Sequence, residues 1–244
     1  MQRKKYGKIK KDFIREKEKN MNRRIALLSE AAAAVLIYWG LSLLIRNGFL
    51  VLFPGEKDFP WIVRQLCGLG ETAVVLLIAF SAAILFLRLF GRLGRFHYVP
   101  VRKEQPEKIA IAILDFTGIA LFIYGGVVLY AIRMHVQATD PFLISGMVRS
   151  LITDAVILSV AEEIFFRGFI LHMLLSGGRE FALVWSTVLF ALAQGNPVHV
   201  VAGLVMGYLL GRMALYYEGI RYGVWCRIAA EAVACILSWV LLLL

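Results

Sequence analysis

The segment AVVLLIAFSAAILFL, residues 73–87, contains no charged side chain over its whole length. Largely apolar stretches of the same kind recur at residues 31–45, 109–132, 198–210 and 232–244. The chain is 60% hydrophobic with a mean hydropathy of +0.73, whereas soluble domains are nearer half apolar and interrupt such runs with charge. Stretches that approach the length of a bilayer crossing predict transmembrane helices. The sequence therefore predicts an all-α fold, a polytopic transmembrane helix bundle.

About seven spans are expected in one membrane domain, residues 25–244. Their approximate limits are residues 25–45, 66–88, 109–131, 148–175, 181–195, 198–217 and 223–243. Between the fifth and sixth spans, Gly195-Asn196-Pro197 divides one apolar stretch into two short helices. Because glycine and proline interrupt helices, a broken, membrane-buried hairpin is an alternative for this region.

The positive charge of the chain is concentrated before the first span. Residues 1–24 hold eleven Lys or Arg against three Asp or Glu, an excess of eight out of a net charge of +10. Such a segment orients a membrane protein with its basic side inward and is attracted to anionic lipid headgroups. We therefore predict a basic N-terminal arm, disordered or interfacial, on the cytoplasmic side of a multi-pass protein of the cell membrane. Membrane lipids are the expected partners, and no nucleic-acid partner is predicted.

Gly203, Gly207 and Gly211 recur every four residues on one face of the sixth predicted span. A stripe of small residues with this spacing lets another helix approach closely. The approaching helix could belong to the same chain or to a second copy, so the oligomeric state stays open.

The run VAEEIFFRGF, residues 160–169, places three ionisable groups inside a predicted span. Placing a charged side chain inside a bilayer costs free energy, so each such residue is expected to have a structural or functional role. Glu163 and Arg167 are four residues apart, where an acid followed by a base pairs well on one helix face. Glu162 is turned away from Glu163 by about 100°, so the same arginine cannot fully satisfy it. We expect Glu162 to face an interior cavity with its charge available, as a general base acting on water requires. An ion-pair latch between helices is the alternative.

This run resembles the first motif, EExxxR, of the CPBP intramembrane proteases, the CAAX-processing and bacteriocin-immunity (Abi-like) group. The resemblance covers roughly residues 140–244. It includes FALAQG at 190–195, the glycine-spaced helix at 203–211 and GVW at 223–225, which follow in order.

The resemblance implies catalytic roles for six residues of this chain. Glu162 would be the base that activates a water, and Glu163 and Arg167 would be its structural partners. The family's second motif, FxxxH, begins at Phe190 but ends here in Gln194. The third motif, HxxxN/D, is read here with Glu231 in place of the histidine, and Cys235 follows four residues later. His199, just beyond the Gly-Asn-Pro turn, could supply an imidazole in place of the missing one.

The implied function is a glutamic-type intramembrane endopeptidase that cleaves a membrane-associated peptide or protein with a Glu162-activated water. The alternative is a catalytically degenerate member that acts as a membrane binding, scaffold or immunity protein. No cofactor is predicted. A metal is disfavoured because no HExxH is present and Arg167 beside the acids lowers their attraction for a cation. A transporter is disfavoured because the sequence lacks repeated halves.

Overall fold

The computed structural model describes residues 2–53, 61–89, 151–195 and 197–243, together with positions 114, 116, 118, 119 and 149. Every regular element in these ranges is a helix, as the sequence predicts. Three of the helices are long and apolar enough to cross a membrane: Glu16–Leu52, Leu66–Leu89 and His199–Tyr216. The all-α membrane bundle is thereby confirmed. Most of the predicted span 109–131 lies outside the described residues, so the number of seven spans stays a prediction.

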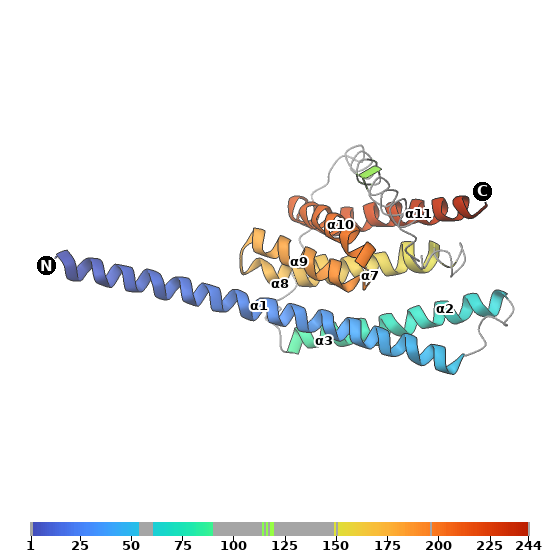
Figure 1. Cartoon of the computed structure of the whole chain (residues 1–244), viewed down its shortest axis with the longest axis horizontal. Helices are drawn as coiled ribbons and strands as arrows, with labels where there is room; N and C mark the ends of the chain where they lie inside the picture. The colour runs from blue at the N-terminus through green and yellow to red at the C-terminus, as the bar shows by residue number, and fades with distance from the viewer. Residues whose placement is uncertain are drawn as a thin grey trace.

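Helix α1 (Gln2–Leu52) contains the first predicted span, 25–45, but is much longer. At 1.5 Å per residue its length is roughly 75 Å, more than twice the thickness of the hydrocarbon layer. Its N-terminal part projects beyond the rest of the molecule (Figure 1). Residues 2–24, the basic arm of the sequence analysis, form the first part of this helix. Contact of this arm with headgroups stays a prediction.

The second long helix consists of α2 (Trp61–Val75), the π-helical segment η2 (Leu76–Phe80) and α3 (Ser81–Leu89). It contains the predicted span 66–88 and packs against α1. The contact surfaces consist of small and aliphatic side chains that recur at helical spacing. Its buried members are Leu27, Ala31, Ala34, Val75, Ala79, Ala83 and Leu87. A polar contact also joins the two helices, between Arg46 Nε and Glu71 Oε1 at 3.6 Å.

The third long helix crosses the middle of the bundle. It consists of η3 (Leu151–Leu158), α7 (Ser159–Glu163), η4 (Ile164–Leu171) and α8 (His172–Leu175), in agreement with the predicted span 148–175. Segments η3 and η4 are π-helical and flank the short α-helical piece that ends in the two glutamates. π-Helical turns are rare and occur frequently at functional sites, because they rotate the following side chains off the regular helix period.

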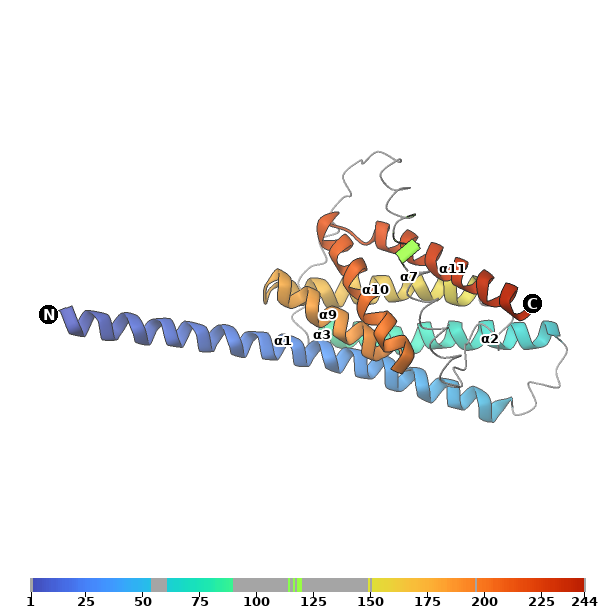
Figure 2. The same ribbon diagram turned by 45° about the horizontal axis from the view of Figure 1, so that its top comes forward.

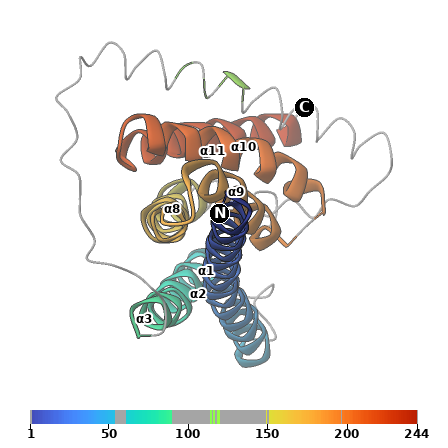
Figure 3. The same cartoon turned by 90° about the vertical axis from the view of Figure 1, so that its left-hand side faces the viewer.

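Three helices complete the described structure: α9 (Arg179–Ala193), α10 (Pro197–Tyr216) and α11 (Arg221–Leu243). They correspond to the predicted spans 181–195, 198–217 and 223–243. The end-on view shows α10 and α11 on one side, α1 to α3 on the other, and α8 and α9 between them (Figure 3). Figure 2 shows α11 alongside the 151–175 helix and α10 against α9.

The glycine stripe of α10 packs within the chain, against α9. A β-carbon at Gly203 would lie 3.1 Å from Ala191 Cα, and one at Gly207 would lie 2.9 Å from Phe190 Cδ1. A β-carbon at Gly211 would lie 2.7 Å from Leu183 Cδ1. These separations are closer than ordinary van der Waals contact, so the two helices approach each other only because side chains are missing at these positions.

A bulky residue at the centre of this stripe is expected to destabilise the bundle. Gly207→Leu would force apart α9 and α10, and overpacking of this kind costs roughly 1–3 kcal/mol. Thermal unfolding of the purified protein in detergent micelles measures the effect. Gly40→Leu on α1 is the matched control, because a β-carbon at Gly40 meets nothing within 4 Å. Equal midpoints for the two variants would contradict the packing role of the stripe.

Candidate active site

The predicted pair between Glu163 and Arg167 is present and buried. Arg167 Nη1 lies 3.1 Å from Glu163 Oε1, and the two side chains are 1% and 0% exposed. Within the described residues, Glu163 Oε2 accepts no hydrogen bond. A β-carbon at Gly223 of α11 would lie 3.0 Å from that oxygen. Glycine at this position therefore lets α11 lie directly against the buried carboxylate.

Arg167 also ties its helix to α9 and α10. Its Nη2 donates a hydrogen bond of 3.3 Å to the carbonyl oxygen of Gly207, and its Cζ lies 4.3 Å from the centre of the Phe190 ring. A guanidinium over an aromatic face is attracted by the ring quadrupole, more strongly where water is excluded. Arg167 is thus a structural cation that joins three helices around the glutamates.

A second arginine, Arg227 of α11, occupies the centre of the cluster. Its Nη2 forms an ion pair with Glu162 Oε2, and its Nη1 lies 3.4 Å from Glu163 Oε1. Its Nε lies 4.0 Å from Glu231 Oε1, one turn further along α11. The Arg227 Cζ lies 4.8 Å from the centre of the Phe190 ring.

These contacts correct the expectation that the charge of Glu162 is available. As predicted, Arg167 does not neutralise the Glu162 carboxylate. Arg227, which lies 65 positions away in the sequence, forms the ion pair with it. Sequence reasoning missed Arg227 as a site residue. The sequence contains a pattern that could have identified Arg227, because Arg227 and Glu231 show the same four-residue spacing of opposite charges as Glu163 and Arg167.

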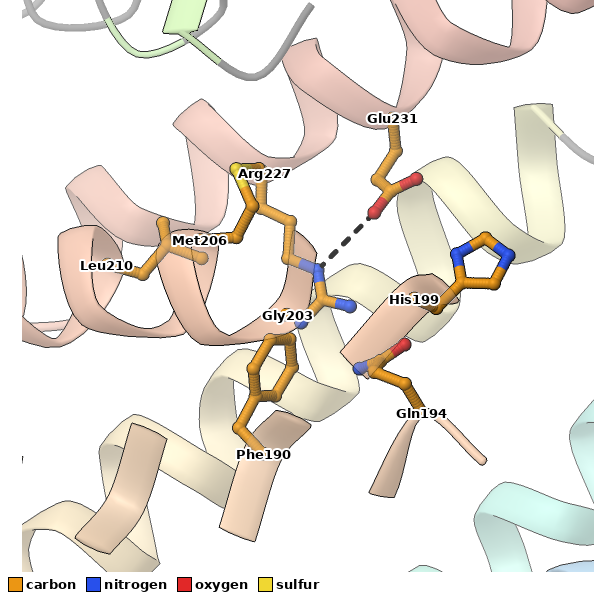
Figure 4. A pocket seen from close by; sticks show the side chains of 8 residues that line it. All are labelled: Phe190, Gln194, His199, Gly203, Met206, Leu210, Arg227 and Glu231. Atoms are coloured by element: carbon orange, nitrogen blue, oxygen red, sulfur yellow. Dashed lines mark ion pairs between the residues drawn. The ribbon is translucent and has the colours of Figure 1, made fainter. Parts of the chain in front are cut away.

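A small cavity lies beside Arg227 among α9, α10 and α11. The space open to the centre of a water molecule is about 20 Å³, which is room for about one water. The residues that line it are Phe190, Gln194, His199, Gly203, Met206, Leu210, Arg227 and Glu231. Figure 4 shows the side chains of Gln194, His199, Glu231 and Arg227 around this space.

The structure thus separates the predicted site residues into two groups. Gln194, His199 and Glu231 come together at the cavity although they lie on different helices. Glu162 is not among the lining residues, and it is connected to them through the Arg227 guanidinium. Glu163 and Arg167 are fully buried.

Among the residues that the structure describes, acidic groups outnumber basic groups in this cluster. Glu162, Glu163 and Glu231 contribute three carboxylates, and Arg167 and Arg227 contribute two guanidinium groups. With all five ionised, the cluster carries one excess negative charge at side chains that are at most 13% exposed. The pair between Arg227 and Glu231 has the longest of the four ion-pair distances.

Within the described residues, no group of three His, Cys, Asp or Glu side chains is arranged to hold a metal ion.

These features define a membrane-embedded helical protein with a buried acidic–basic cluster beside a water-sized cavity. Residues 144–233, which contain the whole cluster and cavity, match the family described as type II CAAX prenyl endopeptidase, Rce1-like. This match confirms, over residues 144–233, the resemblance predicted for residues 140–244. No curated protein and no solved structure matches the chain.

Proposed function

We propose that this protein is a glutamic-type intramembrane endopeptidase of the CAAX prenyl class, which hydrolyses a peptide bond with a water molecule in the cavity. One observation carries the proposal. Gln194, His199, Arg227 and Glu231, from three helices, converge on a single water-sized space within the region that matches the family. Such endopeptidases act on membrane-anchored peptides, so we infer a peptide held at the membrane by a prenyl group as the substrate class.

Glu231 is the carboxylate best placed to act as the base. It lines the cavity, whereas Glu162 is held by Arg227. A general base must lie within hydrogen-bond reach of the water that it deprotonates, and Glu231 lines the space that would hold that water. The family resemblance favoured Glu162 as the base. We propose Glu231 for that role instead. Glu162 and Glu163 then act as positioning residues for the guanidinium.

In the proposed reaction, Glu231 takes a proton from the water while the hydroxyl oxygen attacks the carbonyl carbon of the scissile bond. The carbonyl oxygen becomes an oxyanion, and the Arg227 guanidinium stabilises that charge. His199 and Gln194 hold the water by hydrogen bonds. The C–N bond then breaks, and the proton passes from Glu231 to the leaving amine. The products are a peptide with a new carboxyl end and a peptide with a new amino end.

The alternative function is that of a catalytically degenerate family member. Arg227 pairs with both adjacent glutamates, and a cluster closed in this way serves as an ion-pair latch between the 151–175 helix and α11. In that case the protein would bind a membrane peptide without cleaving it.

Cleavage by the purified protein in liposomes separates the two functions. The substrates are a farnesylated C-terminal peptide and the same peptide without the prenyl group, and mass spectrometry identifies the products. We expect cleavage of the farnesylated peptide by the wild type and its loss in His199→Ala, which removes a hydrogen-bonding group from the cavity. Glu218→Gln, at an exposed turn residue outside the cavity, is the matched control and should cleave normally. Binding of the peptide without any product would establish the degenerate alternative.

A further inference from the structure

A second pocket lies between the first turns of α9 and the last turns of α10, and the proposed hydrolysis does not use it. Its volume is about 580 Å³. The residues that line it are Arg179, Glu180, Leu183, Arg212, Met213, Leu215, Tyr216 and Tyr217. It therefore combines charged groups, aliphatic side chains and two tyrosines in one concave surface.

The two arginines of this pocket keep hydrogen-bond donors available for a ligand. Arg179 Nη2 donates to the carbonyl oxygen of Leu215 at 2.7 Å, and Arg212 Nη1 donates to Tyr208 Oη at 3.2 Å. Each guanidinium carries five N–H donors, so these bonds occupy a minority of them. Glu180 is the opposing charge, and the three groups together carry one excess positive charge.

The side chains around the pocket are of the kinds that gather at the headgroup level of a membrane. The pocket lies at the end of the bundle where the basic N-terminal part of α1 leaves the other helices (Figure 1). At that end, Arg24 Nε donates a hydrogen bond of 2.8 Å to the carbonyl oxygen of Gly177, just before α9. Tyr216, at the end of α10, is 76% exposed. Tyrosine and basic side chains gather at the interface between lipid and water.

We propose that this pocket binds the phosphodiester group of a membrane phospholipid whose headgroup carries a hydrogen-bond donor. Arg179 and Arg212 would hold the phosphate, because planar guanidinium groups match its oxygens. The aliphatic residues Leu183 and Met213 would contact the glycerol and the first acyl carbons. Glu180 would accept a hydrogen bond from an ammonium or hydroxyl group of the same headgroup.

Glu180 makes this proposal selective among phospholipids. Phosphatidylethanolamine and phosphatidylglycerol offer an N–H or O–H donor beside the phosphate. Phosphatidylcholine has a quaternary ammonium that donates no hydrogen bond. The pocket should therefore prefer the first two lipids over the third.

Thermal unfolding of the purified full-length protein in detergent micelles tests the site, with added lipid as the variable. Phosphatidylethanolamine and phosphatidylglycerol are expected to raise the midpoint more than phosphatidylcholine does. Arg179→Gln combined with Arg212→Gln should abolish the difference, whereas Arg88→Gln, on the exposed end of α3, should keep it. Glu180→Ala, which removes the acceptor, should retain the response to lipid but lose the discrimination against phosphatidylcholine.

Two outcomes would overturn the inference. If the double arginine variant responds to lipid as the wild type does, the stabilising lipid binds elsewhere. If inorganic phosphate alone produces the same increase, the pocket is a site for a soluble anion. Neither result depends on whether the protein cleaves peptides, because none of these variants alters the cavity beside Arg227.

Discussion

Arg227→Met is expected to lower the free energy of unfolding by about 3–5 kcal/mol, as removal of one partner from a buried ion pair does. Arg227 contacts Glu162, Glu163 and Glu231 at once. Its loss would leave one guanidinium, that of Arg167, against the three carboxylates of this cluster. Methionine keeps most of the side-chain volume, so the effect would come from charge rather than from a cavity.

The measurement is chemical or thermal unfolding in detergent micelles. Arg221→Met is the control, because Arg221 is an exposed residue at the start of the same helix. Combining Arg227→Met with Glu162→Gln should recover part of the lost stability, since it also removes one of the carboxylates. A double variant that is less stable than Arg227→Met alone would show that Glu162 is not held by Arg227.

Glu231→Gln is expected to lower the cleavage rate of a farnesylated peptide by roughly 10²–10⁴-fold, the usual contribution of a general base. Glutamine has nearly the same shape and can hold the water but cannot take its proton. Glu162→Gln should have the smaller effect, because in the proposed mechanism Glu162 positions Arg227 and does not contact the water. Rates in liposomes for the two variants, compared at equal folded protein, decide between the two carboxylates.

The opposite order of effects would return the role of base to Glu162, as the family resemblance implied. In that case Arg227 would have to move away from Glu162 before the reaction. Equal and complete loss in both variants, with unchanged unfolding midpoints, would mean that the carboxylates act as a unit. Unchanged rates in both would remove the glutamic mechanism altogether.

Part of the site was predictable because it is local. The pair between Glu163 and Arg167 lies within one helical turn, where spacing alone determines which side chains meet. The same local pattern marks Arg227 and Glu231, but the spacing within α11 does not reveal that Arg227 also reaches Glu162 and Glu163. Those contacts depend on how α11 packs against α7, which the sequence pattern does not specify.

The amino-acid sequence by itself determined that this is an all-α membrane protein, because apolar runs must satisfy their backbone hydrogen bonds within helices when no water is present. It also determined the family motif and the limits of most helices. Only the tertiary structure decided which charges neutralise each other and which residues line the cavity. The reason is physical: hydropathy and helix period act along one segment, whereas the partner of a buried charge is chosen by close packing between helices, here made possible by the missing side chains of Gly207 and Gly223.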